Sequence, residues 1–131
     1  MIGWMLMRAL VLSLLLSGCL QLPPASPGEP YPTFAAAEAV LREVLPVGRP
    51  VDVRICCLRE SNAAGLTLPG PLGSLVVLVE EHMLGPEQVR ALVHEWAHAM
   101  SWGDNVCGDH DEAWGVAYSR AYRAVIEGWT P

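Results

Sequence analysis

Three histidines and a glutamate carry the clearest chemical signal in the sequence. His94, Glu95 and His98 form an H-E-x-x-H motif inside a segment with helical periodicity. Positions i and i+4 of a helix lie on the same face, so both imidazoles can bind one metal ion, typically zinc. Glu95 would then contact a water on that ion rather than the ion itself, as a general base does. The alternative is that His94 and His98 are merely polar positions on a surface helix.

A catalytic zinc ion usually has three protein ligands and a fourth, open position, so a third ligand is expected. Ser101 and Asp104 occupy the positions where the metzincin pattern has its glycine and third histidine, so that pattern fails. A gluzincin arrangement would need Glu112 or Glu127, and neither has a fitting context. His110, which opens a second helical pattern, is the best candidate for the third ligand.

This arrangement resembles the SprT-like and WLM-type minimal metallopeptidases, which are zincins. The resemblance rests on H-E-W-A-H at 94–98 and on H-x-x-x-W at 110–114, and it covers roughly residues 75–127. It implies a zinc ion bound by His94, His98 and His110, with Glu95 as the general base. SprT-like proteins often act near DNA, but this chain departs from them in its charge and in its N-terminus.

The elements that must position these residues follow from periodicity. Apolar side chains recur at helical spacing from Pro86 to Trp102, and Gly103 is a natural stop. The β-branched run at 75–79 predicts a strand before this helix. The other expected elements are helices at 33–45 and 111–127, a strand at 51–56 and a long loop at 61–74. The expected fold is therefore α+β, a small zincin-like domain with a short β-sheet packed on a metal-bearing helix and a C-terminal helix.

Two finer expectations concern the ends of these elements. Asp109 and Glu112 are spaced like the N-cap of the last helix and its capping-box partner. The strand at 75–79 is expected to align an extended peptide substrate by edge pairing.

The N-terminus has the composition of a secretory signal. Arg8 precedes a short apolar run, and L-S-G-C at 16–19 resembles the bacterial lipobox, in which cleavage occurs before a cysteine that becomes lipidated. The apolar run at 9–22 spans 14 residues, fewer than the ~20 that cross a bilayer. An ordinary signal peptide and a short membrane anchor are the alternatives.

These features divide the chain into a signal peptide at 1–18, a proline-rich tether at 19–32 and one metallopeptidase domain at 33–131. Lipidation of Cys19 would anchor the protein to a membrane of the bacterial cell envelope, facing the periplasm or the exterior. The expected partners are a protein or peptide substrate and this membrane.

The net charge limits the class of partner, and the cysteines suggest a disulfide or a further zinc ligand. The chain has eight basic and fourteen acidic residues, a net charge of −6 and no basic cluster, which disfavours nucleic-acid binding. In an oxidising compartment, Cys56 or Cys57 could form a disulfide with Cys107. Only one of the two neighbours can point the right way, because successive strand residues face opposite sides. Cys107 could instead be a zinc ligand.

The predicted function is that of a zinc metallopeptidase acting on proteins or peptides in the cell envelope. Zinc lowers the pKa of a bound water to about 7, and Glu95 would accept its proton and pass it to the departing amine. The alternatives from other classes are a non-catalytic zinc-binding lipoprotein, acting as a scaffold or inhibitor, and a lysis accessory. Glu95 argues against metal binding alone, because a structural zinc site needs no acid beside its ligand.

Overall fold

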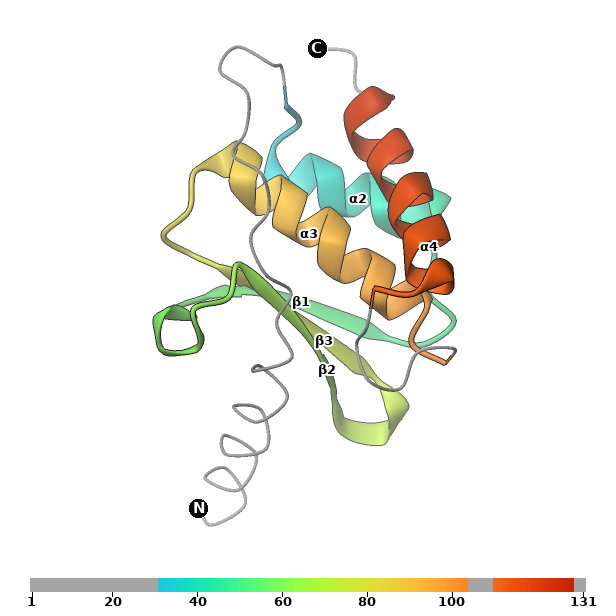
Figure 1. Cartoon of the computed structure of the whole chain (residues 1–131), viewed down its shortest axis with the longest axis horizontal. Coiled ribbons are helices and arrows are strands. Elements are labelled where there is room, and N and C mark those ends of the chain that lie inside the picture. Colours follow the sequence, from blue (N-terminus) through green and yellow to red (C-terminus); the bar gives the residue numbers. More distant parts are fainter. Residues whose placement is uncertain (1–30, 104–109, 129–131) are drawn as a thin grey trace.

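The computed structural model describes residues 31–103 and 110–128 (Figure 1). The fold is α+β, as the sequence predicts. Its elements in chain order are α2 (Phe34–Val44), β1 (Val51–Cys56), β2 (Gly65–Pro69), β3 (Leu75–Glu80), α3 (Gly85–Met100), α4 (Glu112–Tyr122) and a π-helical continuation at Arg123–Glu127. Short 3-10 turns lie at Arg59–Ser61 and Pro71–Gly73.

The three strands form one mixed sheet in the order β1-β3-β2. β1 runs parallel to β3, with Val53 opposite Val77, and β2 runs antiparallel to β3, with Thr67 opposite Val77. The strand predicted at 75–79 is therefore the central one, with both edges already paired. The expectation that it aligns a peptide by edge pairing is wrong, because no backbone donor or acceptor on it remains for another strand.

The segment at 61–74 is also more ordered than predicted. Its glycines and prolines suggested one long loop, but β2 occupies Gly65–Pro69 in its middle. Leu66 and Leu68 alternate there with Gly65 and Thr67, which is the period of a strand. This correction matters for the site, because Gly65 and Thr67 lie on the side of the sheet that faces α3.

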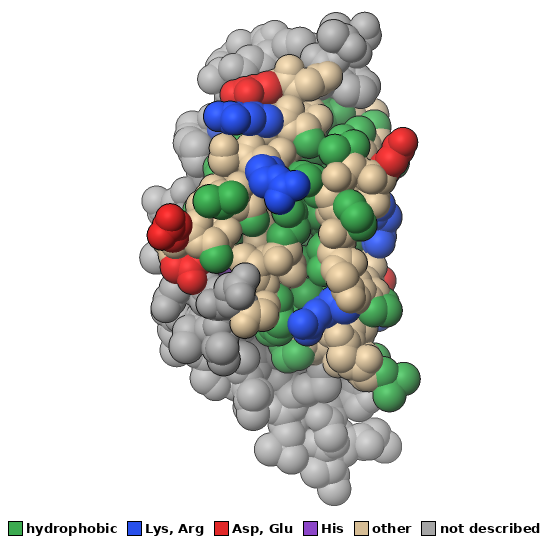
Figure 2. Space-filling view, turned by 90° about the vertical axis from the view of Figure 1, so that its right-hand side faces the viewer, with side chains coloured by type: hydrophobic (Ala, Val, Ile, Leu, Met, Phe, Trp, Pro, Cys, Tyr) green, Lys and Arg blue, Asp and Glu red, His purple; other side chains and the backbone are tan. Residues whose placement is uncertain are grey.

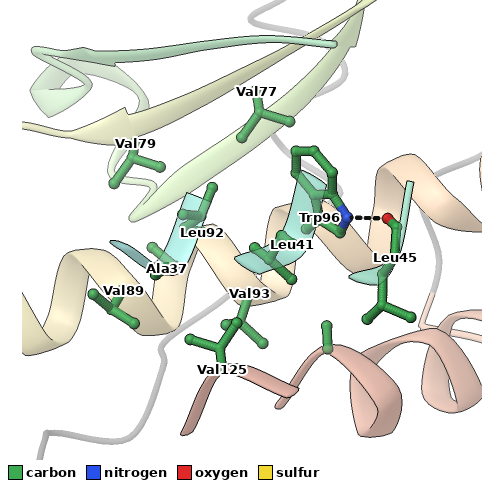
Figure 3. Close-up of a cluster of buried hydrophobic side chains, with 12 residues drawn as sticks. Ala37, Leu41, Leu45, Val77, Val79, Val89, Leu92, Val93, Trp96 and Val125 are labelled. Carbon is green, nitrogen blue, oxygen red and sulfur yellow. Dashed lines mark hydrogen bonds between the residues drawn. The ribbon is translucent and has the colours of Figure 1, made fainter. Parts of the chain in front are cut away.

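One face of the sheet carries the core (Figure 3). Leu75, Val77 and Val79 of β3 are fully buried, and α3 packs directly on this face. α2 and α4 pack in turn on α3, so α3 lies in the middle of the domain (Figures 1 and 3). Ten residues of this helix are buried. A helix enclosed in this way has a fixed position and rotation, so the side chains on it are held in place.

The ends of the helices agree with the sequence at some positions and not at others. Thr33 is the N-cap of α2, and its side chain accepts a hydrogen bond of 3.2 Å from the amide of Ala36, as expected for a capping threonine. The N-cap of α4 is Asp111 rather than Asp109, since its carboxylate accepts the amide of Trp114 at 2.9 Å. His110 therefore lies just before the helix. Asp109 itself lies outside the described residues.

The predicted signal peptide, Cys19 and all but the end of the predicted tether lie outside the described residues. Among residues 31–103 and 110–128, no helix has the length and apolar character needed to cross a bilayer.

Candidate metal centre

Three imidazoles from two elements converge beside the C-terminal half of α3. His94 and His98 lie one turn apart on this helix, and His110 reaches them from the residue before the N-cap of α4. Their potential ligand atoms all lie within 4.8 Å of one another. The Nε2 atoms of His94 and His110 are 3.1 Å apart, and the ring centroids of His98 and His110 are 5.1 Å apart. The structure thus brings together the three histidines that the sequence singled out.

The electrostatics of the cluster favour neutral imidazoles at His94 and His98. His94 and His98 are 8% and 5% exposed, whereas His110 is exposed. Burial, together with the neighbouring imidazoles, lowers the pKa of His94 to about 3 and that of His98 to about 4. Both rings are therefore uncharged at pH 7 and offer a nitrogen lone pair, the form that binds a metal.

This donor set fits a zinc ion. Three neutral nitrogen ligands and one open position make a known type of catalytic zinc site, in which nitrogens about 2 Å from the ion lie about 3.5 Å apart. The observed separation of His94 and His110 is already close to that value. His94, His98 and His110 would hold the ion, and small rotations of their rings would complete the site.

Trp114 and Tyr118 form an aromatic wall against the cluster. The ring centroid of Trp114 lies 4.3 Å from that of His110 and 4.9 Å from that of His94, and Tyr118 stacks on Trp114 at 4.9 Å. Burial raises the pKa of the Tyr118 hydroxyl, which therefore stays protonated at neutral pH. Within the described part of the chain, Trp114 Nε1 is buried without an acceptor. Trp114 and Tyr118 therefore cover one side of the cluster, while His110 stays exposed.

Strand β2 holds the side chain of Glu95 in place. Its side chain is only 1% exposed. The hydroxyl of Thr67 lies 2.8 Å from Glu95 Oε2 and 2.9 Å from the main-chain oxygen of Glu95, and it can donate its proton to either acceptor. Gly65 leaves the space that this side chain fills, because a Cβ there would lie 2.7 Å from Glu95 Cγ. Thr67 and Gly65 thus fix the position of the carboxylate.

Thr67 and Gly65 are the site residues that the sequence interpretation missed. The alternation in G-L-T-L-P at 65–69 predicts a short strand whose Gly and Thr share one face. The surrounding glycines and prolines obscured this signal. Nothing in the sequence alone pairs this face with Glu95, because that contact depends on the order of the strands.

Trp96, the residue after Glu95, fixes the rotation of α3 about its own axis. It is 1% exposed, and its indole N–H donates a hydrogen bond of 2.9 Å to the carbonyl of Leu45 at the end of α2 (Figure 3). Because this indole is locked in the core, the neighbouring Glu95 and the two histidines are directed toward β2 and α4.

Of the three cysteines expected to form a disulfide, the structure describes Cys56 and Cys57. Within the described residues Cys56 and Cys57 form no disulfide, and the first is partly buried and the second exposed. Cys107, the expected disulfide partner and alternative zinc ligand, lies outside the described residues. Its pairing therefore stays a prediction. Glu112 and Glu127, the gluzincin candidates, are exposed on α4 and its continuation and are not part of the histidine cluster.

The metal-free protein is expected to lose stability as the pH falls from 7 to 5. His94 and His98 have an ordinary pKa of about 6.5 in the unfolded chain, and the fold lowers both values. The unfolded chain then binds more protons, so acid favours unfolding. Denaturant unfolding of metal-free protein across this pH range measures the effect. The double variant His94→Gln, His98→Gln should lose most of this dependence of stability on pH. If its stability falls with pH as steeply as that of wild type, other groups cause the effect.

The described site thus combines three convergent imidazoles with a buried carboxylate that β2 holds in place. Comparisons of the chain with protein-family models, with curated proteins and with solved structures gave no match.

Proposed function

We propose that the protein is a zinc-dependent metallopeptidase that hydrolyses peptide bonds of proteins or peptides. The observations that carry this proposal are three convergent imidazoles and, on the same helix as two of them, the buried carboxylate of Glu95, which follows His94 in the sequence. A structural zinc site is usually closed by four protein ligands, whereas the described cluster supplies three and leaves one position open. A metallopeptidase site uses both a metal to activate water and a base to accept its proton.

Each residue has a distinct role in this proposal. Zinc, when bound by His94, His98 and His110, would activate a water molecule and polarise the peptide carbonyl. Glu95 accepts the proton of the attacking water and delivers it to the departing amine, so one carboxylate serves as base and then as acid. The hydroxyl of Thr67 keeps this carboxylate in one orientation through both transfers.

The edge strand β2 is the best candidate for aligning an extended substrate. One of its edges pairs with β3, and no described strand pairs with the other. Because Thr67 of this strand contacts Glu95, a peptide added to the free edge would run beside the catalytic carboxylate. In this proposal β2 takes the substrate-aligning role that the sequence suggested for β3, because β3 is central and has no free edge.

The surface is consistent with a protein substrate rather than a nucleic acid. The arginine side chains on the face shown in Figure 2 do not merge into one continuous basic surface, and apolar or uncharged atoms separate them. The net charge of −6 acts in the same direction, because phosphate backbones require clustered positive charge. We place the protein in the bacterial cell envelope, anchored through Cys19, on the basis of the signal-like N-terminus and the L-S-G-C sequence.

Metal dependence tests this function. Purified protein is incubated with an unfolded protein such as casein, first as isolated, then after treatment with a chelator, and finally after zinc is restored. Cleavage that disappears with the chelator and returns with zinc supports the metallopeptidase. Protein that holds zinc but cleaves neither casein nor a panel of envelope peptides would instead be a zinc-binding lipoprotein without catalysis.

Loss of the Thr67 hydroxyl is expected to slow cleavage without releasing zinc. Thr67→Val keeps the shape of the side chain but removes the donor to Glu95, and misplacement of a catalytic group costs roughly tenfold to a hundredfold in rate. Thr67→Ser retains the hydroxyl and should restore most of the rate. The measurements are kcat, KM and zinc content, and the expected loss is in kcat. If Thr67→Val cleaves as fast as wild type, Thr67 does not position the base.

A further inference from the structure

A second group of side chains with metal-ligand atoms lies at the other end of α3. β1 and β3 are parallel neighbours, with Cys56 opposite Glu80, so their C-terminal ends meet at one edge of the sheet. Cys57 follows β1, Glu80 ends β3, and His82 lies in the turn that leads to α3. The Cys57 thiol, one Glu80 oxygen and one His82 ring nitrogen lie within 4.8 Å of one another.

Glu80 is the fixed member of this group. It is 8% exposed, and its Oε2 and Oε1 atoms accept the amide N–H groups of Leu58 at 2.5 Å and of His82 at 3.1 Å. Each carboxylate oxygen has two lone pairs, so two hydrogen bonds leave acceptor sites for a cation. Backbone donors that orient a carboxylate in this way are a common feature of metal ligands.

The other two members are able to move toward Glu80. Cys57 is exposed, and the side chain of His82 is 48% exposed and paired with Glu81 at 3.2 Å. Ligand atoms around a tetrahedral zinc ion lie about 3.5 Å apart, so displacements of about 1 Å would close the site. A hollow of about 330 Å³ lies beside two of the three residues, and its lining includes Leu58, Asn62, Glu80 and His82 but not Cys57.

We propose that Cys57, Glu80 and His82 form a second zinc site, separate from the three-histidine cluster. Sulfur, oxygen and nitrogen donors together suit a borderline cation such as zinc, and three protein ligands leave one position open. The two sites lie at opposite ends of α3. In Figure 1 the chain passes from β3 into the start of this helix, whereas α4 begins beside its other end. The second site does not depend on peptidase activity, so either proposal can fail without the other.

Cobalt distinguishes the two sites, because among the residues that the structure describes only the second group contains a thiol. Co²⁺ added to the reduced, full-length protein should give a sulfur-to-cobalt charge-transfer absorption in the near ultraviolet. Cys57→Ser should abolish this absorption, and His82→Ala should weaken cobalt affinity by about tenfold or more. Cys56→Ser is the matched control and should keep the absorption, since its sulfur is not one of the three converging atoms. His98→Ala should keep it too.

Three results would overturn this site. The first is that reduced wild-type protein shows no thiolate absorption with cobalt. The second is that Cys57→Ser retains the absorption in full. The third is that Cys107→Ser or Cys56→Ser removes it while Cys57→Ser does not. Circular dichroism of each variant confirms that the fold is kept, and His82→Ala, which alters a half-exposed side chain, provides a second variant with little risk to folding.

Discussion

Glu95→Gln is expected to lower the rate of peptide cleavage by about 10²–10⁴-fold, the usual contribution of a general acid–base group. The amide has the same size as the carboxylate and still accepts the hydrogen bond from Thr67, so the side chain keeps its place between β2 and α3. It cannot take a proton from water at neutral pH. Zinc affinity should change little, because Glu95 is not one of the convergent ligands.

The control for this variant is Glu43→Gln, which changes an exposed carboxylate on α2 in the same way. Its cleavage rate should equal that of wild type. Rates are measured as kcat/KM on one peptide identified from the casein digest, with zinc content measured on the same preparations. A Glu95→Gln protein that holds zinc and cleaves as fast as wild type would rule out Glu95 as the base.

His110→Ala is expected to remove most of the zinc from the three-histidine cluster and to abolish cleavage. Loss of a direct ligand should cost at least the 10–100-fold in affinity that loss of a residue orienting a ligand costs. His110 is exposed and lies outside α4, so its removal leaves no buried cavity and the fold should persist. Zinc is best measured by equilibrium dialysis in a Cys57→Ser background, where the second site cannot contribute.

Asp104→Ala is the informative comparison for His110→Ala. Asp104 occupies the position of the third histidine in the metzincin pattern and lies outside the described residues. Full zinc occupancy is expected in this variant. If instead Asp104→Ala releases the metal and His110→Ala retains it, the assignment of the third ligand is wrong.

The three convergent histidines were predictable because their signals are local. The i, i+4 spacing in H-E-x-x-H places two imidazoles on one face of any helix, and the helix itself follows from periodicity. His110 could also be predicted from the sequence, because it opens the next helical pattern. The structure brings its ring to the other two through packing of α4 on α3. The other elements follow from the same periodicity, with β2 as the exception, and the strand predicted at 51–56 is observed with those bounds.

What the sequence could not supply depends on tertiary arrangement. The role of Thr67 and Gly65 follows from the order β1-β3-β2, which places β2 beside β3 and under α3. Spacing along the chain does not fix that order. The same limit applies to Glu80 and His82, which approach Cys57 only because β1 and β3 are parallel neighbours. The Asp109 cap was wrong for a local reason, since Asp111 is an equally good N-cap two residues later.

The most direct test of the metallopeptidase proposal is the incorporation of solvent oxygen into new peptide termini. Zinc-loaded wild-type protein and Glu95→Gln protein, purified in the same way, are incubated with casein in water enriched in oxygen-18, and the products are analysed by mass spectrometry. The proposal predicts new peptides whose C-terminal carboxylates carry oxygen-18, abundant with wild type and nearly absent with Glu95→Gln. Equal labelled products from both proteins, or none from fully zinc-loaded wild type, would contradict it.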